Sequence, residues 1–324
     1  MSTKIEWADL TINPTAGCMK CSPGCANCYA ERFASRLAKN PQTAEKYVGV
    51  VDDAGKWTGR ISEPDYSVFE RLPKKPQRVF LGSMTDLFFR GVNDFGSKGL
   101  RDGDGNLYEF VPDTMHVRIA RLLLQISKHK QHTFMMLTKR PDEMKEVLNA
   151  MTVHPLLNLW VGVTVCNHDE LWKLDVLQEI SAAKRFVSFE PLLEDVGDIS
   201  KWVFNRRQAI QHLVSGPACL NYEQADDSVA YPLDWVICGG ETGHGARPVH
   251  PAWVRSLRDQ CHEAMVPFFF KSWGEFTATP RPDATYVDGT PVPADAEPVE
   301  YKRVGKKCAG RLLDGVEYSQ FPEV

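Results

Sequence analysis

The segment RVFLGSM, residues 78–84, shows the pattern that decides the fold: a short apolar run followed by glycine and polar residues. Five later runs resemble it, namely TFMMLTK (133–139), LWVGVTV (159–165), RFVSFEP (185–191), DWVICGG (234–240) and VPFFFKS (266–272). Short runs rich in Val and Phe, without strict alternation, are typical of strands buried on both faces of a parallel sheet. ADLTINP, residues 8–14, supplies a seventh strand ahead of them.

Segments with helical periodicity lie between these runs, at 29–39, 115–129, 141–150, 168–180 and 251–263. Repeated strand–helix units with right-handed crossovers predict an α/β fold, a (β/α) barrel of the TIM type, full or partial, rather than an open doubly wound sheet. In such a barrel, functional residues gather in the loops that follow the C-terminal ends of the strands.

We expect the barrel to occupy residues 1–275 and a C-terminal extension, loosely structured, to occupy 276–324. Gly, Asp and Pro are frequent in 40–76 and 90–112, which indicates insertions over the functional face. Within the second insertion, FGSKGLRDGDGNLYEF (95–110) lacks the ligand spacing and the terminal glutamate of a calcium loop, so we predict a turn or hairpin there.

The composition is that of a soluble globular protein, with 43% apolar and 25% charged residues. A formal charge of −4 and a pI near 6.2 give no global attraction to nucleic acid or to an anionic membrane, but leave room for a local basic groove. The N-terminus lacks a signal peptide, and no apolar run approaches the roughly 20 residues of a membrane span. We therefore expect a cytoplasmic protein without membrane contact.

Four cysteines, Cys18, Cys21, Cys25 and Cys28, are crowded into AGCMKCSPGCANCYAERFA (16–34). In a reducing compartment such a cluster indicates metal binding or redox chemistry more readily than disulfides. Zinc sites usually separate their cysteine pairs by a longer stretch, whereas iron–sulfur clusters accept this crowding. The spacing favours an iron–sulfur cluster, with zinc or unligated thiols as the alternatives. The scattered cysteines are predicted to be buried small apolar residues: Cys166, Cys219, Cys238, Cys261 and Cys308.

Cys21, Cys25 and Cys28 form C-x3-C-x2-C, followed by Tyr29, and this resembles the motif of the radical S-adenosylmethionine (SAM) superfamily. The resemblance implies a 4Fe-4S cluster on three cysteines, with an open iron that binds SAM. Reductive cleavage of SAM then gives a radical that removes hydrogen from the substrate. In such enzymes the cofactor carries the difficult chemistry and the protein aims it.

A wider resemblance covers most of the chain and points to a phage-associated family of radical-SAM-like, three-Cys-motif proteins. Its matching segments include VFLGSMTDLFF, MMLTKRP, FVSFEPLL, ICGGETG and PFFFKSWGEF. That family's cysteines correspond to Cys18, Cys25 and Cys28, which makes Cys21 an extra. Both interpretations share Cys25 and Cys28, and Cys18 and Cys21 are rival third ligands.

Polar residues at the first two of these strand ends are candidates for binding SAM. Ser83, Thr85 and Asp86 follow the run at 78, and the resemblance implies that they meet the SAM amino group, with Asp86 as an acceptor. The alternative is a helix N-cap at Asp86. Thr138 and Lys139 end the run that begins at residue 133. Together with Arg140, they are expected to contact the SAM carboxylate or an anionic substrate. The alternative is a solvated pair of cations at a helix start.

The later strand ends carry the candidate catalytic residues. Ser188 and Glu190 interrupt an apolar strand, and a buried carboxylate is costly unless it is paired, so Glu190 is expected to bind SAM ribose or substrate. The alternative is an internal ion pair with an arginine. Gly239 and Gly240 permit close approach to a ligand, and Glu241 follows them. Lys271 is expected to neutralise Glu190 or Glu241.

Together these residues predict a radical SAM enzyme that acts on an unknown substrate, with nucleic acid or a modified nucleotide as the first to test. A similar Thr-Lys pair occurs in the spore photoproduct lyase group, which acts on DNA. Such an enzyme needs an electron donor, and a phage-encoded protein is a further expected partner. The alternative is a non-enzymatic, phage-encoded interaction protein that binds zinc or an iron–sulfur cluster.

Overall fold

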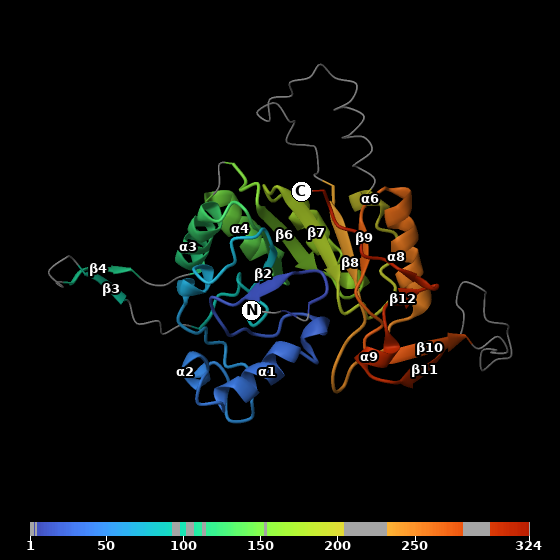
Figure 1. Cartoon of the computed structure of the whole chain (residues 1–324), viewed down its shortest axis with the longest axis horizontal. Coiled ribbons are helices and arrows are strands. Elements are labelled where there is room, and N and C mark those ends of the chain that lie inside the picture. Colours follow the sequence, from blue (N-terminus) through green and yellow to red (C-terminus); the bar gives the residue numbers. More distant parts are fainter. Residues whose placement is uncertain are drawn as a thin grey trace, which may run out of the picture. The chain divides into compact units, whose positions relative to one another are not determined.

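The computed structural model describes residue 3 and residues 5–92, 98–101, 107–111, 115–151, 154–203, 232–280 and 299–323. Its architecture is mixed α/β, around a seven-stranded sheet with the order β1-β2-β5-β6-β7-β8-β9 (Figure 1). Strand pairs whose register is described in this sheet are parallel. The strands follow one another in chain order without a reversal, as in a barrel and unlike a doubly wound sheet. The predicted α/β fold is confirmed in this form, consistent with a partial (β/α) barrel.

The chain divides into two compact units, described separately below. The first, unit 1, comprises Met1–Cys21, Cys28–Gly162 and Ile180–Ala183. The second, unit 2, comprises Ser22–Asn27, Val163–Glu179 and Lys184–Val324. β6, Leu159–Thr164, begins in unit 1 and ends in unit 2.

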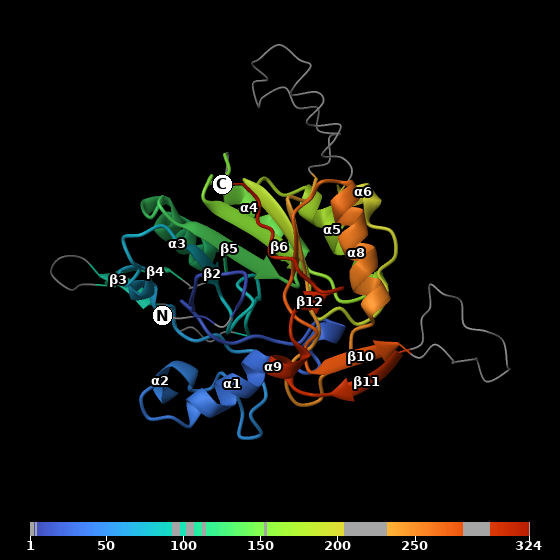
Figure 2. The same ribbon diagram turned by 45° about the vertical axis from the view of Figure 1, so that its right-hand side comes forward.

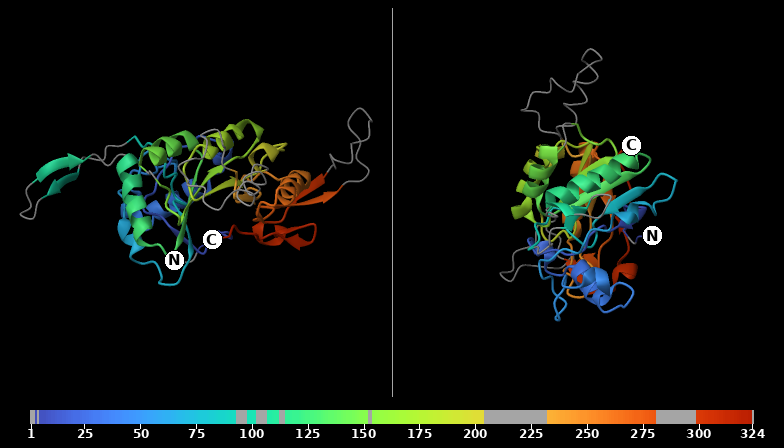
Figure 3. Two further views of the ribbon diagram at one scale, coloured as in Figure 1. Left: turned by 90° about the horizontal axis from the view of Figure 1, so that it is seen from above. Right: turned by 90° about the vertical axis from the view of Figure 1, so that its left-hand side faces the viewer.

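Unit 1 contains three further strands of the sheet, β1 (Leu10–Ile12), β2 (Arg78–Leu81) and β5 (Thr133–Thr138). Most apolar side chains of β2 and β5 are almost completely buried, as expected for strands covered on both faces, whereas β1 is only partly buried. The longer helices of unit 1 are α3 (Met115–Lys128) and α4 (Pro141–Met151), which contact each other. The predicted hairpin is present as antiparallel β3 (Lys98–Arg101) and β4 (Leu107–Val111) (Figure 3).

Two helices of unit 1 follow the cysteine loop, α1 (Tyr29–Ala38) and the short α2 (Ala44–Tyr47), and they lie side by side (Figure 2). α1 buries the small residues Ala30 and Ala34 in an apolar cluster with Tyr47. A 3-10 turn, η2 (Tyr66–Phe69), lies later in the same insertion. The insertion at 40–76 therefore contains ordered helices that the sequence did not indicate.

Unit 2 contributes three strands, β7 (Lys184–Phe189), β8 (Trp235–Cys238) and β9 (Phe268–Phe270). Its helical elements are η3 (His168–Glu170), α5 (Trp172–Gln178), α6 (Ser200–Val203) and α8 (Pro251–Glu263). α8 packs against both α6 and β9 (Figure 1). The predicted helix at 168–180 is thus divided between η3 and α5.

The C-terminal part of unit 2 is more regular than the loosely structured tail that the sequence indicated, where it is described. β10 (Phe276–Pro280) pairs with β11 (Val299–Arg303) in an antiparallel ribbon. α9, β12 and β13 follow at Lys306–Ala309, Leu312–Leu313 and Val316–Glu317. The proposed boundary between a barrel and a C-terminal extension at residue 275 stays a prediction.

The outer edge of β9 is covered by a segment from near the end of the chain. The amide of Phe270 donates to the carbonyl of Tyr318 at 3.0 Å, and the amide of Gln320 donates to the carbonyl of Phe268 at 3.2 Å. Phe269 and Ser319 form the antiparallel bridge between these bonds. Because this edge is taken, no further parallel strand can be added beside β9, which favours a partial barrel over a closed one.

No helix within the described ranges is long and apolar enough to cross a membrane.

Candidate functional site: the cysteine loop and the strand ends

The candidate residues lie where barrel logic places them, at or just after the C-terminal ends of strands. In unit 1, Ser83, Thr85 and Asp86 follow β2, and Thr138 and Lys139 lie at the end of β5. In unit 2, the candidates belong to the ends of three strands: Ser188 and Glu190 to β7, Gly239, Gly240 and Glu241 to β8, and Lys271 to β9. Glu190 follows β7, which ends at Phe189, and so does not lie inside a strand as the sequence suggested.

The cysteine loop is divided between the units: Cys18, Cys21 and Cys28 belong to unit 1, and Cys25 to unit 2. None of the four forms a disulfide; Cys21 is exposed, Cys25 is buried, and the other two are half-buried. Among the described residues, no three His, Cys, Asp or Glu side chains are gathered closely enough to hold a metal ion. The donor chemistry nevertheless fits an iron–sulfur cluster, since four thiols lie within eleven positions.

In unit 1, residues at the end of β2 hold the beginning of the cysteine loop. The hydroxyl of Thr85 donates to the carbonyl of Gly17 at 2.6 Å, and these two residues also form a backbone bridge. The hydroxyl of Tyr29, directly after the last cysteine of the loop, donates to the carbonyl of Ser83 at 2.7 Å. The Ser83 hydroxyl donates to Asn13. Thr85 therefore contacts the chain just before the four cysteines, and Ser83 contacts it just after them.

Arg140 adds a third attachment in unit 1. Its guanidinium donates to the carbonyl of Met19, between Cys18 and Cys21, at 2.7 Å, and it lies over the ring of Phe89, 5.0 Å from the centroid. Arg140 directly precedes α4, so it lies at a helix start as the alternative held, but it is half-buried against the loop and not fully solvated.

Asp86 connects the ends of β2 and β5. Its Oδ1 accepts from the Thr138 hydroxyl at 2.6 Å and from the amide of Phe88 at 3.1 Å, and its Oδ2 accepts from the amide of Lys139 at 3.0 Å. The side chain is buried, and no helix begins at Asp86. The alternative of a helix N-cap is therefore wrong, and the carboxylate instead holds two neighbouring strand ends together.

In unit 2, Glu241 is the centre of a second attachment. It accepts from the backbone amide, Nε and Nη2 of Arg247 at 2.7–2.9 Å, and from the side-chain amide of Asn27 at 3.0 Å. Arg247 also donates to the carbonyl of Pro23, and Asn27 donates to the carbonyl of Gly245. The loop after β8 thereby grips the segment on both sides of Cys25.

The ionisation of Glu241 follows from these contacts. Burial opposes the charged form, but the hydrogen bonds from Arg247 and Asn27 outweigh it and lower the pKa of the carboxyl below its ordinary value of 4.5. The group is ionised at neutral pH. Its oxygens are engaged by Arg247 and Asn27, so the structure gives Glu241 a holding role toward the cysteine loop.

Cys166, directly after β6, packs on the same segment. Its thiol accepts from the Ser22 hydroxyl at 3.8 Å, and a Cβ on Gly24 would lie 2.4 Å from the Cys166 sulfur. The thiol is fully buried. Gly24 is therefore required, because any side chain there would collide with Cys166.

Glu190 and Lys271 form a close ion pair in unit 2 through Oε1 and Nζ, and both side chains are largely buried. Lys271 thus neutralises Glu190, one of the two acids that the sequence offered it. The alternative interpretation of Glu190, an internal ion pair, is present with a lysine in place of the expected arginine. Ser188 is buried within β7, and its carbonyl accepts from the amide of Val165.

The glycines after β8 allow the chain to approach itself. A Cβ on Gly239 would lie 3.2 Å from the Cβ of Lys271, and one on Gly240 would lie 2.3 Å from the carbonyl oxygen of Trp273. Within the described residues, these neighbours explain the glycines without a ligand. Trp273 itself donates from Nε1 to the carbonyl of Leu312 and packs on Phe270.

Of the scattered cysteines that the structure describes, all but one are buried. Cys166, Cys238 and Cys261 are buried as predicted, whereas Cys308 is exposed on α9, so the prediction for Cys308 is wrong. Cys219 lies outside the described residues. Burial raises the pKa of the Cys238 and Cys261 thiols, which keeps them protonated and unreactive.

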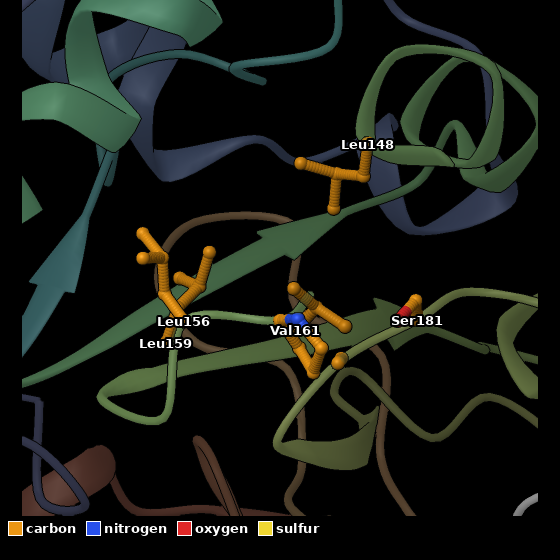
Figure 4. Close-up of a pocket in the computed structure, with 7 residues that line it drawn as sticks. Leu148, Leu156, Leu159, Val161 and Ser181 are labelled. Carbon is orange, nitrogen blue, oxygen red and sulfur yellow. The ribbon is translucent and has the colours of Figure 1, made fainter. Parts of the chain in front are cut away.

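A small pocket in unit 1 has none of the candidate residues in its lining (Figure 4). None of its lining side chains is ionisable: Leu148, Pro155, Leu156, Leu159, Val161, Ser181 and Ala182. Its lining is therefore mainly apolar, with the Ser181 hydroxyl as its polar side-chain group.

Two asparagines with contacts around the cysteine loop or the strand end beside it were missed from the sequence. Asn13, after β1, accepts from the Ser83 hydroxyl and from the amide of Met84. Asn27 lies between Cys25 and Cys28 and joins Glu241 to Gly245. The signal for both was their position, since one ends a predicted strand and the other lies inside the cysteine motif.

Comparison with known proteins gives a family without a described activity. Neither a curated protein nor a solved structure matches the chain. The sequence model of one family, described as a protein of unknown function (DUF5131), matches residues 2–98 and 107–322. Because this match covers nearly all of the sequence, the chain belongs to the DUF5131 family.

Proposed function

We propose that this protein is a radical SAM enzyme whose cysteine loop holds a 4Fe-4S cluster on Cys25, Cys28 and either Cys18 or Cys21. One observation carries the proposal: four cysteines, none of them in a disulfide, lie on an eleven-residue loop whose backbone is hydrogen-bonded by strand-end side chains in each unit. Cluster ligands need such support, because groups behind the ligands orient them and tune the metal.

When bound, the cluster supplies the electron that cleaves SAM and so generates a hydrogen-abstracting radical. Toward this chemistry, Thr85, Tyr29 and Arg140 restrain the loop in unit 1, and Glu241 and Arg247 restrain it in unit 2. These are positioning residues, because they act through the backbone that carries the cysteines.

The Glu190–Lys271 pair is the proposed contact of unit 2 with SAM or substrate. It is largely buried, and its two groups can exchange partners with a hydroxyl or carboxylate that enters beside them. The expected substrate is a nucleic acid or a modified nucleotide. An electron donor is required, and a second, phage-encoded protein is a further proposed partner. The proposed location is the cytoplasm.

The test is anaerobic purification, reconstitution with iron and sulfide, and electron paramagnetic resonance of the reduced protein with and without SAM. Wild type, Cys18→Ala, Cys21→Ala and, as a matched control, Cys308→Ala are compared. A four-iron signal that shifts with SAM, survives in Cys308→Ala and disappears in one of the first two variants supports the proposal and identifies the third ligand. Stoichiometric zinc without a four-iron signal overturns it.

The same experiment decides the second candidate, a non-enzymatic metal-binding protein that interacts with another protein. This candidate is favoured by the strand-end acids of unit 2, which are already paired with Lys271 and Arg247 as they would be in a rigid scaffold. Bound zinc, or a cluster signal that SAM does not change, would support it.

A further inference from the structure

The outward surface of α1 differs from the rest of this acidic chain. Tyr29 and Phe33 are exposed by 51% and 44%, although large aromatic side chains are usually buried. They lie four residues apart and therefore on the same face of the helix. Arg36 lies on this face too, with its guanidinium over the Phe33 ring, 4.9 Å from the centroid.

The charges of α1 are sorted between its two sides. With 3.6 residues per turn, Arg32, Arg36 and Lys39 fall on the exposed arc beside the two aromatic rings. The only acid of the helix, Glu31, falls on the opposite side, where it is 4% exposed.

Glu31 is also neutralised locally. Its carboxylate accepts from Lys20 at 3.0 Å and from Lys56 at 3.3 Å, and also from the amide of Trp57. Burial alone would raise its pKa, but these hydrogen bonds outweigh burial and lower the pKa, so the charge remains inside this cluster. The exposed arc therefore carries cations and aromatic rings without an acid.

The nearest acids in sequence after α1 belong to two following segments of unit 1. Asp52 and Asp53 lie in the turn that reaches Gly55, and a Cβ on Gly55 would lie 2.4 Å from the Ser35 hydroxyl, at the flank of the arc. Glu45 lies on α2. The α1 arc, defined as Tyr29, Arg32, Phe33, Arg36 and Lys39, is thus a narrow strip one helix long.

From this sorting we infer that the α1 arc binds single-stranded nucleic acid. Unpaired bases stack on exposed aromatic rings, and arginine and lysine beside the rings contact the phosphates; proteins that bind single strands use this combination. A duplex hides the faces of its bases, so it would lose the stacking contribution. Binding of a single strand to the α1 arc does not require an iron–sulfur cluster. The inference that the bound strand is the substrate of an enzyme rests on the proposed function.

The test is fluorescence anisotropy with labelled oligo(dT) and oligo(U) of about 20 nucleotides, at about 50 and 200 mM salt. Affinity should fall with salt. Phe33→Ala should weaken binding roughly tenfold through lost stacking, and Arg36→Ala should weaken it and reduce the salt slope by about 0.7 per lost phosphate contact. The two oligonucleotides show whether DNA or RNA is preferred.

Trp172→Ala and Lys201→Ala are the matched controls, because they remove an equally exposed ring and an exposed cation from unit 2. They should bind as wild type does. The inference is overturned if neither single strand binds at the lower salt, if a duplex binds as tightly, or if Trp172→Ala costs as much as Phe33→Ala. Circular dichroism confirms that each variant is folded.

Running the titrations with and without reconstituted iron and sulfide separates the two proposals. Equal binding in both states, without a four-iron signal, supports the α1 arc and overturns the proposed function. A SAM-sensitive signal without binding of either single strand overturns the α1 arc alone.

Discussion

The strand ends of the two units grip the cysteine loop by different chemistry. In unit 1, the hydroxyls of Thr85 and Tyr29 donate to backbone carbonyls, and the carboxylate of Asp86 accepts from one hydroxyl and two backbone amides. In unit 2, the grip passes through an ion pair, Glu241 with Arg247. The two halves of the loop should therefore respond differently to mutation and to pH.

Glu241→Ala should have the largest effect. It leaves Arg247 and Asn27 without their shared acceptor, and the loss of one partner from a buried, hydrogen-bonded pair costs about 2–4 kcal/mol when the other partner is partly exposed. Urea denaturation measures the free energy of unfolding. Lys201→Ala, in an exposed ion pair with Asp175, is the control and should cost less than about 1 kcal/mol. Equal costs for the two variants would show that Glu241 does not hold the loop.

Asp86→Ala should follow, with a loss of about 2–3 kcal/mol, because three donors lose their buried acceptor. The same denaturation experiment distinguishes a structural role of Asp86, as an acceptor between two strand ends, from a role in binding SAM. If Asp86 served SAM alone, the substitution would leave the stability of the unliganded protein unchanged and weaken only SAM binding.

The strands of the sheet and the positions of the candidate residues along the chain could be predicted from the sequence. The seven strands appear where short apolar runs predicted them, since burial on both faces leaves a strong pattern, and the candidate residues lie at the strand ends. The partners could not be predicted: Glu241 meets Asn27 across 214 positions, and Asp86 meets Thr138 across 52. Local patterns carry no information about such pairings, so residues that hold the loop looked like residues that bind a ligand.

Gly24→Ala should cost about 1–3 kcal/mol, because the new methyl group overlaps the Cys166 sulfur. The double variant Gly24→Ala/Cys166→Ala removes the overlapping atom and should recover most of this loss. Free energies of unfolding for all four members of the cycle give the coupling. Additive costs would mean that Cys166 does not support the loop of unit 2.

The contribution of Glu241 to the free energy of unfolding should depend on pH, unlike that of the hydroxyl contacts in unit 1. The pKa of Glu241 is lowered in the folded protein, so its contribution to stability is complete above about pH 4.5 and is lost as the pH falls below that value. The stability difference between wild type and Glu241→Gln should therefore shrink as the pH falls from 5 toward 3. A constant difference over this range would contradict an ionised Glu241.

Thr85→Val should have the smallest effect, about 1 kcal/mol, since one hydrogen bond to Gly17 is lost and the shape is kept. Because the hydroxyl does not titrate in this range, the cost should be the same at pH 5 and pH 7. A cost that changed with pH would remove the contrast between the two units.

The covered edge of β9 has a consequence for handling the protein. β9 consists of three consecutive phenylalanines, and Phe321 packs on Trp235 and Phe269 beside it. If residues 318–321 were removed or displaced by heating, this strand would expose unpaired amides along a highly apolar sequence. Strands of that kind seed aggregation. We therefore expect residues 318–321 to keep the protein soluble by covering the edge of β9, independently of the chemistry of the cysteines.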